Sequence, residues 1–447
     1  MHIPSAFITQ LRHIVQILQN QLPIPGIAVS LTTPDEVVWQ YHSGIANDVT
    51  RQAVTADTVF ALASNTKAIT SMMLSKAQGD RLCDIQLPMR LVYDRRLFAD
   101  DAAHKQATMR DLAGHITGLP RHELVLFDAK DRADVVRRLP HLAANAPFRQ
   151  RFQYQNVLYV VLGYILEQLY ALPYEQLIQR HLAAPCGLDI QWRGDAHTSL
   201  HAQGYQCDMQ SATPVVPYTR SIDNPAGGVM MNNRALARWL QVLLRQGEPL
   251  LTPALWQPLV TPILGGDVGY AMGWDVHVDH GVQLIHHGGV IDGFQSEIAV
   301  WPDYGLALGV MTNQVGIPVP EMIRLVVHDY LCQQIKPDYM AYFAHRYAPV
   351  VESTVATAST HQSVPSALQG AFGHAGYGLL RVTSDALTYA GQTYPLQGTV
   401  TDGWWTTFRW GIRVHLMPTS AGWRLESHAG SVSVADFVPE IFSSPQA

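Results

Sequence analysis

Strand-forming and helix-forming segments follow one another along this chain in an order that restricts the folds open to it. Residues 27–45 are rich in Val and Ile and are divided by a Thr-Thr-Pro-Asp turn, which predicts two strands. Helical spacing of apolar residues dominates residues 64–244, and strand patterns return in residues 270–312 before a helix at residues 321–334. This order predicts one sheet built from both ends of the segment, with a helical insertion between them.

The C-terminal part of the chain follows a different pattern. Residues 348–364 are mostly small and polar, contain proline and show no sustained period, which is typical of a linker. Beyond them, short alternating segments separated by turn signals predict a small antiparallel β domain. A length of 447 residues is also long for a single domain. We therefore predict a first domain at residues 1–347, a linker at 348–364 and a second domain at 365–447.

Composition favours small-molecule chemistry over binding to nucleic acid or membranes. The formal net charge is -6 at pH 7 and Lys and Arg form no run, so no basic footprint is expected. No stretch reaches the roughly 18 uninterrupted apolar residues of a membrane span. Apolar residues between positions 7 and 22 recur at helical spacing, which predicts an amphipathic helix rather than a signal peptide and favours a cytoplasmic location.

A serine with a lysine three positions later, Ser64-Asn65-Thr66-Lys67, opens the helical region. A serine hydroxyl is a weak nucleophile until a base takes its proton, and Lys67 would lie one helical turn away on the same face. The start of a helix also places Ser64 near the positive end of the helix dipole, which favours a developing oxyanion. The alternative is a Ser helix cap beside a solvated Lys, and taken alone the motif is a weak signal.

A second element, Tyr154-Gln155-Asn156, precedes a strongly apolar helix. A tyrosine held near cations loses its proton more easily, and an adjacent asparagine can hold a substrate amide. The alternative is a buried Tyr with Asn as a helix cap.

A third element, His287-Gly288-Gly289-Val290, ends a predicted strand. Glycine permits close approach of the backbone to a substrate, and a strand-edge N–H can complete an oxyanion hole with the N–H of Ser64. The alternative is an ordinary glycine-rich turn with a surface His.

The order S-x-x-K, Y-x-N and H-x-G resembles the signature of serine β-lactamases and penicillin-binding proteins. Other segments resemble the class C-like esterase and D-aminopeptidase branch of this family. Arg110–Pro120 (RDLAGHITGLP) is similar to its DLLxHxTGLP segment, and Pro225–Val229 with Leu236–Trp239 is similar to its PAGG…DLA helix entry. The resemblance covers roughly residues 10–335. The C-terminal part resembles the lipocalin-like β-barrel appended in some archaeal and bacterial peptidase members.

The resemblance implies an α/β (α+β) fold: an antiparallel sheet flanked by helices, a helical subdomain and a small C-terminal antiparallel β-barrel. It implies that Ser64 is acylated and that Lys67 is its base or orients it. Tyr154 would pass the proton to the leaving group and later activate water, Asn156 would bind substrate, and His287 would take the place of the third-motif lysine. Further substrate contacts are expected from Gly288, Gly289 and Val290.

The oxyanion hole would be formed by the N–H groups of Ser64 and Val290, or of Ser64 and Gly289 if the register shifts by one through His286. The third element lacks both the lysine and the following Thr or Ser that bind a β-lactam carboxylate, so efficient β-lactamase activity is not expected. His287 is expected to gain charge, and with it affinity for carboxylates, toward pH 6.

The expected activity is that of a serine hydrolase acting through an acyl-enzyme on small esters, amides or D-amino-acid peptides. The alternatives are a β-lactamase or D-alanyl carboxypeptidase, an acyltransferase and, in a different class, a catalytically inactive binding module. A homo-oligomer is left open, and no cofactor, nucleic-acid partner or membrane partner is expected.

Neither the histidines nor the cysteines predict a metal site. His277, His280, His286 and His287 lie close together in the sequence, but no carboxylate or cysteine completes a familiar spacing, and the chemistry of the family needs no metal. The four cysteines are far apart, which predicts free thiols.

Overall fold

The contacts of the chain divide it into two compact units. The computed structural model describes residues 3–195, 200–208, 211–264, 268–347, 362–408, 412–428 and 432–439. The first unit consists of Met1–Ile85 and Leu162–Ala348, and the second of Gln86–Val161 and Pro349–Ala447. The helical segment before residue 162 therefore groups with the C-terminal sheet, and not with the first unit. The expected domain boundary at residue 348 stays a prediction. Most of the expected linker, residues 348–364, lies outside the described residues.

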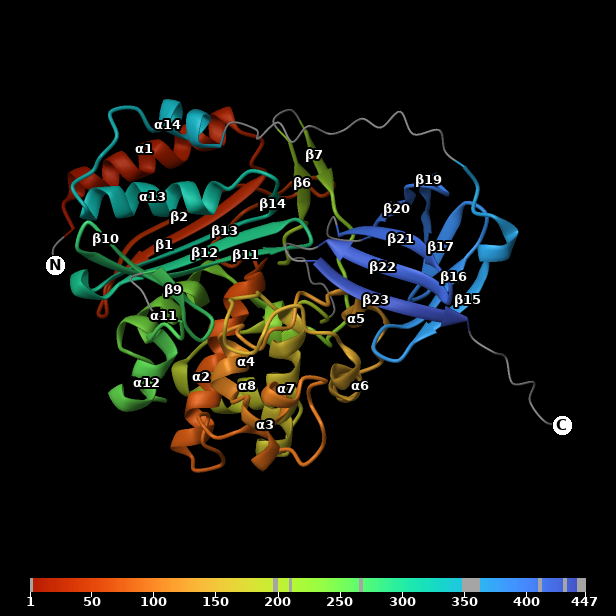
Figure 1. The fold of residues 1–447 in the computed structure, drawn as a ribbon. Helices are drawn as coiled ribbons and strands as arrows, with labels where there is room; N and C mark the ends of the chain where they lie inside the picture. The colour runs from red at the N-terminus through yellow and green to blue at the C-terminus, as the bar shows by residue number, and fades with distance from the viewer. Residues whose placement is uncertain are drawn as a thin grey trace. The chain divides into compact units, whose positions relative to one another are not determined.

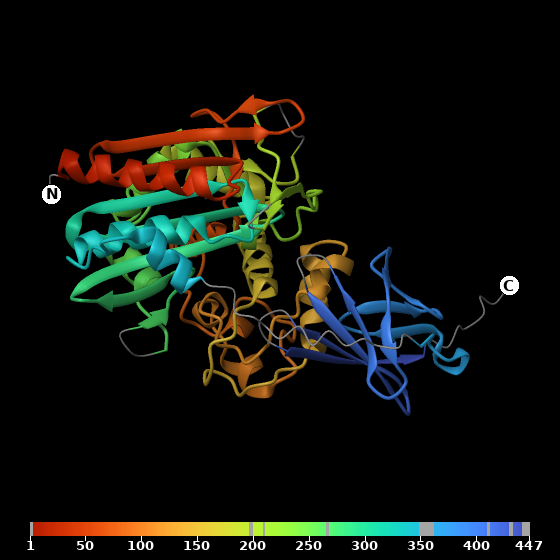
Figure 2. The ribbon, with the colours of Figure 1, turned by 90° about the horizontal axis from the view of Figure 1, so that it is seen from above.

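An eight-stranded antiparallel sheet is the framework of the first unit, in the order β3-β2-β1-β13-β12-β11-β10-β9 (Figures 1 and 2). Strand β1 (Gly26–Thr32) pairs with β2 (Val37–Asn47) on one side and with β13 (Leu306–Thr312) on the other. The remaining strands are β3 (Gln52–Ala53), β9 (Val268–Tyr270), β10 (Asp275–Asp279), β11 (Val282–Ile291) and β12 (Phe294–Trp301). Strands from both ends of the segment form one sheet, which confirms the expected architecture.

Helices cover both faces of this sheet (Figure 1). On one face, α1 (Ser5–Gln21) and α13 (Val319–Leu331) share a buried hydrophobic cluster with the central strands. The apolar positions of α1 point inward, as the helical spacing predicted. On the other face lies α11 (Asn233–Leu244), whose Leu236 fills the space beside Gly309; a Cβ there would lie 2.7 Å from Leu236 Cδ2. Close packing of α11 on the sheet therefore depends on this glycine.

Smaller elements complete the first unit. Two three-stranded sheets are formed by β4 (Phe60–Ala61), β8 (Val229–Met231) and β5 (Gln191–Trp192), and by β14 (Gln314–Val315), β6 (Tyr205–Cys207) and β7 (Ala212–Pro214). Its other helices are α2 (Thr66–Gly79), α8 (Tyr174–Ile178), α9 (Ala184–Cys186), α10 (Asn224–Gly227), α12 (Pro253–Val260) and α14 (Tyr339–Arg346). Helix α7 (Asn156–Tyr170) begins in the second unit and ends in the first.

The second unit combines short helices with an antiparallel nine-stranded sheet that curves into a nearly closed barrel (Figure 2). Its helices are α3 (Asp101–Gln106), α4 (Met109–Ala113), α5 (Leu124–Asp128) and α6 (Arg132–Arg138). In spatial order its strands are β18 (Gln392–Pro395), β17 (Ala386–Tyr389), β16 (Gly378–Val382), β15 (Gly370–His374), β23 (Val432–Pro439), β22 (Gly422–His428), β21 (Arg413–Thr419), β20 (Gly403–Thr407) and β19 (Gln397–Thr399). Trp404 and Trp423 meet inside it, with ring centroids 5.6 Å apart. The expected small β domain is confirmed.

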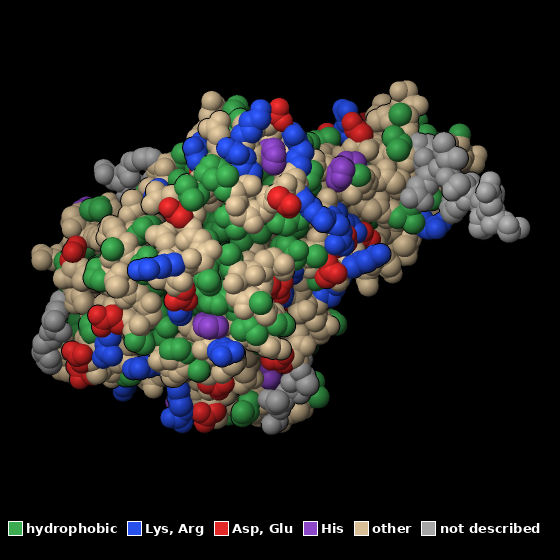
Figure 3. All heavy atoms as spheres, turned by 90° about the horizontal axis from the view of Figure 1, so that it is seen from below, with side chains coloured by type: hydrophobic (Ala, Val, Ile, Leu, Met, Phe, Trp, Pro, Cys, Tyr) green, Lys and Arg blue, Asp and Glu red, His purple; other side chains and the backbone are tan. Residues whose placement is uncertain are grey.

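Within the described residues no single helix is long and apolar enough to cross a membrane; only Asn156–Tyr170 taken with Tyr174–Cys186, a pair bent by 71°, has the length and composition. In the view of Figure 3, acidic side chains lie among the basic ones across the visible face.

Candidate active site

The turn that carries Ser64 is held in a strained conformation. Strand β4 pairs with β8, and the N–H of Leu62 donates to Val229 O at 2.9 Å. Ala63 then adopts a φ of 50°, in the left-handed region, which costs a non-glycine residue about 1–3 kcal/mol. Because α2 begins at Thr66, Ser64 lies at the positive end of this helix. The strained residue thus directly precedes the expected nucleophile.

Lys67 is fully buried and contacts Ser64. Its Nζ donates to Ser64 Oγ at 3.1 Å and to Ala226 O at 2.8 Å. A buried amine needs such acceptors, because desolvation of an unpaired ammonium is costly. The alternative of a solvated Lys beside a capping Ser is therefore excluded.

Polar side chains to which the sequence assigned no role connect the Ser64 turn to neighbouring strands by hydrogen bonds. Asn65 Nδ2 donates to Ser296 Oγ at 2.8 Å, and this hydroxyl donates in turn to Leu62 O at 2.7 Å. Thr66 Oγ1 accepts from the N–H of Val229 at 3.1 Å. The two residues inside the S-x-x-K motif thus serve to position the turn.

Strand β11 brings the third element against the Ser64 turn. A side chain at Gly289 would overlap Leu62 O and Ser296 Oγ and would lie 3.1 Å from Ala63 Cβ, so this approach requires glycine. Pairing of β11 with β10 ends at His286, so one edge of the strand from His287 onward is outside that ladder. An oxyanion hole requires a backbone N–H that points at the developing oxyanion, and the prediction places this N–H on the same edge. Whether Val290 or Gly289 provides it stays a prediction.

The hydrogen bonds of His287 determine its tautomer. Its Nδ1 lies 2.5 Å from Gly288 O, a carbonyl that can only accept, so Nδ1 carries the proton. Its Nε2 therefore accepts from the hydroxyl of Tyr270 at 3.0 Å. Tyr270, on β9, had no sequence signal, because nothing in the local pattern links it to His287.

Burial keeps His287 uncharged. Loss of hydration lowers the pKa of its imidazole to about 3, and the neighbouring Lys67 acts in the same direction. The expectation that His287 gains charge toward pH 6 is therefore wrong. The reason is that its side chain is buried, and the H-x-G motif carries no information about burial.

A buried ion cluster joins two segments that reach the Ser64 turn. Arg193 donates to both carboxylate oxygens of Asp223 at 2.7 Å and to Asp292 Oδ2 at 2.9 Å, and its side chain is 3% exposed. Asp223 directly precedes α10, which carries Ala226, and Asp292 lies in the turn between β11 and β12. Arg193 therefore couples the acceptor of Lys67 to the strand that carries the third element.

In the second unit, an imidazole and a guanidinium lie against Tyr154. The ring centroids of His115 and Tyr154 are 4.5 Å apart, and His115 Nδ1 accepts from the N–H of Gln155 at 3.1 Å. Arg121 Cζ lies 5.1 Å from the centroid of the Tyr154 ring. A cation at this place favours the phenolate form of a tyrosine.

Asn156 is hydrogen-bonded within the second unit. Its Nδ2 donates to Glu123 Oε1 at 2.8 Å, and the same oxygen accepts from Arg121 Nε at 2.9 Å. Glu123 is 2% exposed. The structure thus adds Arg121 and Glu123 to the Y-x-N element, and the substrate-binding role of Asn156 stays a prediction.

A group of potential metal ligands lies beside β10. Among the described residues, donor atoms of Asp279, His328 and Cys332 come within 4.8 Å of one another. Trp301 Nε1 donates to His328 Nδ1 at 3.1 Å, so the proton of the neutral imidazole is on Nε2 and faces Asp279 Oδ2 at 3.2 Å. A metal at Nε2 would need this proton removed, so the group fits a hydrogen-bonded relay better than a metal site.

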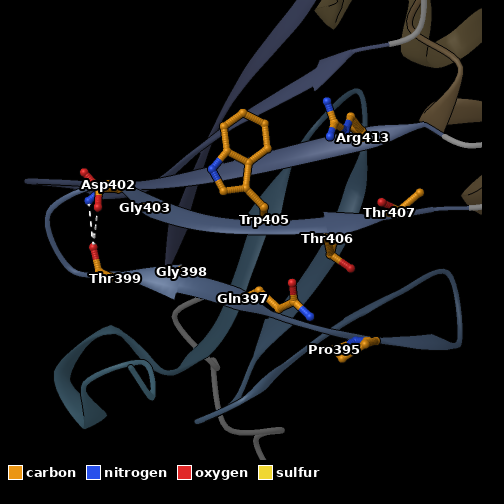
Figure 4. Close-up of a pocket in the computed structure, with 10 residues that line it drawn as sticks. All are labelled: Pro395, Gln397, Gly398, Thr399, Asp402, Gly403, Trp405, Thr406, Thr407 and Arg413. Atoms are coloured by element: carbon orange, nitrogen blue, oxygen red, sulfur yellow. Dashed lines mark hydrogen bonds between the residues drawn. The ribbon is translucent and has the colours of Figure 1, made fainter. Parts of the chain in front are cut away.

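A cavity of about 720 Å³ opens on the C-terminal sheet between β19, β20 and β21 (Figure 4). Trp405 and Arg413 contribute to its lining, and the Trp405 ring stacks on His415 with centroids 3.8 Å apart. The described lining residues include none of the three sequence elements. The cavity is therefore not the place where the expected chemistry would occur.

Comparisons with known proteins identify the family of the chain. The family model described as beta-lactamase matches residues 11–329. The chain belongs to the beta-lactamase family. Unguisins hydrolase ungD' of Aspergillus campestris is 29% identical over 320 residues, which are 65% of this chain and 58% of that protein. The chain thus spans less than two thirds of the length of this curated relative.

Solved structures show the same fold over almost the whole chain. The octameric penicillin-binding protein homologue from Pyrococcus abyssi has a TM-score of 0.66 and 19% identity, and the match covers 96% of this chain and 99% of that one. SurE, solved with D-Leu, has a TM-score of 0.62 and 17% identity, and the match covers 96% of this chain and 97% of that one. Both matches extend over the C-terminal sheet. At this identity they establish the fold alone.

We expect Arg193→Met to reduce the free energy of unfolding by about 3–5 kcal/mol, because it leaves two buried carboxylates without their cation. Urea denaturation at neutral pH measures this loss. Arg234→Met is the matched control, since it removes an exposed ion pair with Asp57 and should leave stability unchanged. Equal losses in the two variants would contradict the role assigned to Arg193.

We expect the preference for a carboxylate-bearing substrate over its methyl ester to stay constant between about pH 8 and pH 6, because an imidazole with a pKa of about 3 is neutral throughout. The ratio of the two kcat/KM values measures this preference. The expectation would be refuted by a ratio that rises as the pH falls, with an apparent pKa near 6, and that stays constant when His287 is replaced. Since the unfolded imidazole titrates near 6.5, His287 also lowers stability progressively as the pH falls below that value.

Proposed function

We propose that the chain is a serine hydrolase that forms an acyl-enzyme on Ser64 and acts on small esters, amides or D-amino-acid peptides. The observation that carries the proposal is the contact of a fully buried Lys67 Nζ with Ser64 Oγ at 3.1 Å, at the positive end of α2. A buried amine within hydrogen-bond reach of a hydroxyl on a strained turn is the arrangement that an activated nucleophile needs.

The proposed reaction has two steps that use the same groups. Ser64 Oγ attacks the substrate carbonyl while its proton passes to Lys67 or Tyr154, and the tetrahedral oxyanion is held by N–H groups of Ser64 and Val290. Collapse of this intermediate breaks the bond to the leaving group, which takes up the proton. Water then attacks the acyl carbon in the same way and regenerates the Ser64 hydroxyl. The division of labour between Lys67 and Tyr154 is open.

The third element favours substrates without a β-lactam carboxylate. His287 is neutral and its Nε2 accepts from Tyr270, and Gly288 has no side chain, so a cation and a hydroxyl are both missing from these two positions. A carboxylate gains most from charge-assisted donors, whereas an uncharged ester or amide loses nothing here. A β-lactamase or D-alanyl carboxypeptidase is therefore the second candidate.

Peptides containing D-residues fit this proposal in one further respect, because one structural neighbour was solved with D-Leu. One curated relative is named as a hydrolase of unguisins, which agrees with a hydrolytic reaction. An acyltransferase would use the same acyl-enzyme with an amine or hydroxyl in place of water. A homo-oligomer is proposed only by analogy with the octameric neighbour.

We expect Ser64→Ala to abolish hydrolysis and covalent labelling while the variant stays folded, because the half-buried hydroxyl contributes reactivity more than packing. Intact mass after incubation with a fluorophosphonate should show one adduct in the wild type and none in the variant. Retention of the adduct or of most of the activity in Ser64→Ala would overturn the proposal, and a catalytically inactive binding module would then be favoured.

We expect a short p-nitrophenyl ester and a D-amino-acid amide to be hydrolysed with higher kcat/KM than a chromogenic cephalosporin. The reason is the lack of a fixed cation and hydroxyl at His287 and Gly288. Penicillins should act at most as slow acylating ligands, which intact mass detects as an adduct on Ser64. A cephalosporin that is turned over faster than both other substrates would instead favour the β-lactamase alternative.

A further inference from the structure

The segment Arg121–Leu124 alternates between two environments in the second unit. Arg121 and Glu123 contact Tyr154 and Asn156, as described above. His122 and Leu124, the residues next to them, contact the C-terminal sheet instead. In both views α5 lies beside that sheet (Figures 1 and 2). One short segment thus touches the Y-x-N element with one set of residues and the barrel with the other.

A buried hydrogen-bond chain fixes His122 to the barrel. Its Nε2 lies 2.9 Å from Ala143 O, a carbonyl that can only accept, so Nε2 carries the proton. Nδ1 therefore accepts from the hydroxyl of Tyr377 at 2.7 Å. The oxygen of this hydroxyl also lies 3.3 Å from Ser433 Oγ, on strand β23 of the barrel. His122 and Tyr377 are both without exposed surface, so leaving either partner unsatisfied would be costly.

Two further contacts hold the same segment. The hydroxyl of Tyr389 lies 3.0 Å from Leu124 O and 2.7 Å from Tyr377 O, which ties the backbone of the segment to the barrel. Gly378 has a φ of +86°, and a side chain there would overlap the carboxylate of Asp128, at the end of α5. The barrel and this part of the chain are therefore packed together closely enough to require glycine.

Glu123, which faces the Y-x-N element, is buried and therefore requires hydrogen-bond donors for its carboxylate. A carboxylate with 2% exposure is stable only when cations and N–H donors replace its water. Arg121 Nε and Asn156 Nδ2 both donate to its Oε1. Because Glu123 holds both groups, displacement of Glu123 would move the guanidinium beside Tyr154 and the amide of Asn156 together.

We propose that Arg121 and Glu123 are positioning residues for Tyr154 and Asn156, and that the C-terminal barrel holds them in place through Tyr377 and Tyr389. The barrel is then a structural support for the Y-x-N element within the second unit. This inference rests on the proposed function, since it gives Tyr154 a proton-transfer role in hydrolysis.

The test uses the full-length chain with a short p-nitrophenyl ester, for which few contacts outside the reacting groups are needed. Glu123→Gln removes the charge that holds Arg121, and Tyr377→Phe removes the hydroxyl that holds His122. Each variant should lower kcat by about tenfold or more and change KM by less than about twofold, because misplaced proton-transfer groups impair the chemical step. Tyr41→Phe, which loses one hydroxyl bond to Gln19, is the matched control and should keep the wild-type kcat.

A conservative pair of variants separates positioning from mere stability. Arg121→Lys keeps a cation beside Tyr154, whereas Arg121→Gln does not, and Arg121 is partly exposed, so both should fold. At equal Tm, the kcat of Arg121→Lys should be at least about tenfold higher than that of Arg121→Gln, because only Lys keeps a positive charge beside Tyr154. Equal kcat in these two variants would overturn the positioning role.

The other outcomes are also decisive. If Glu123→Gln and Tyr377→Phe both keep kcat within about twofold of the wild type, the inference fails even though hydrolysis through Ser64 stands. If Tyr377→Phe does not fold, Tyr389→Phe takes its place, and unchanged kcat in that variant contradicts the link to the barrel. If Ser64→Ala retains activity, the proposed function itself fails, which is a different result from any of these.

Discussion

The burial of Lys67 beside Ser64 is the interaction on which the surrounding structure depends. An amine without exposed surface requires acceptors, and it has Ser64 Oγ and Ala226 O. The second acceptor is delivered by α10, whose start is held through Asp223 and Arg193. Space for the α2 backbone is also restricted: a Cβ on Gly273, which has a φ of +84°, would lie 2.9 Å from the carbonyl carbon of Lys67. The fold thus positions Lys67, the residue proposed to activate Ser64, from several sides.

Much of the fold follows from local patterns. Alternating and helical spacing located the strands near residue 27 and after residue 270, and therefore the sheet assembled from both ends of the segment. The grouping of residues 86–161 with the C-terminal sheet had no such signal. It depends on single buried contacts, such as His122 with Tyr377, between residues that are far apart in the chain. Neither residue belongs to a periodic pattern that would pair them.

In the site, too, contacts within one element could be predicted from the sequence, whereas contacts between distant elements could not. Ser64 and Lys67 could be identified because a helix places them one turn apart, and the structure has them in contact. Tyr270, Arg193 and Glu123 could not, because their partners come from other elements and no spacing relates them. The expected gain of charge by His287 toward pH 6 was wrong for a related reason. A pKa of about 3 results from burial, and burial is a property of the fold, not of the motif.

The neutral state of His287 has a consequence for the charge balance around Lys67. A second cation on β11 would repel the buried amine, and Lys67 already acts to lower the pKa of His287. A neutral imidazole with its single proton on Nδ1 avoids this repulsion. Its Nε2 accepts from the hydroxyl of Tyr270 and orients it, so the His287 side chain adds no charge to the third element. In the proposed reaction, electrostatic stabilisation of the oxyanion would therefore come from Lys67, the helix end at Ser64 and the backbone N–H groups, none of which requires a charge on the substrate.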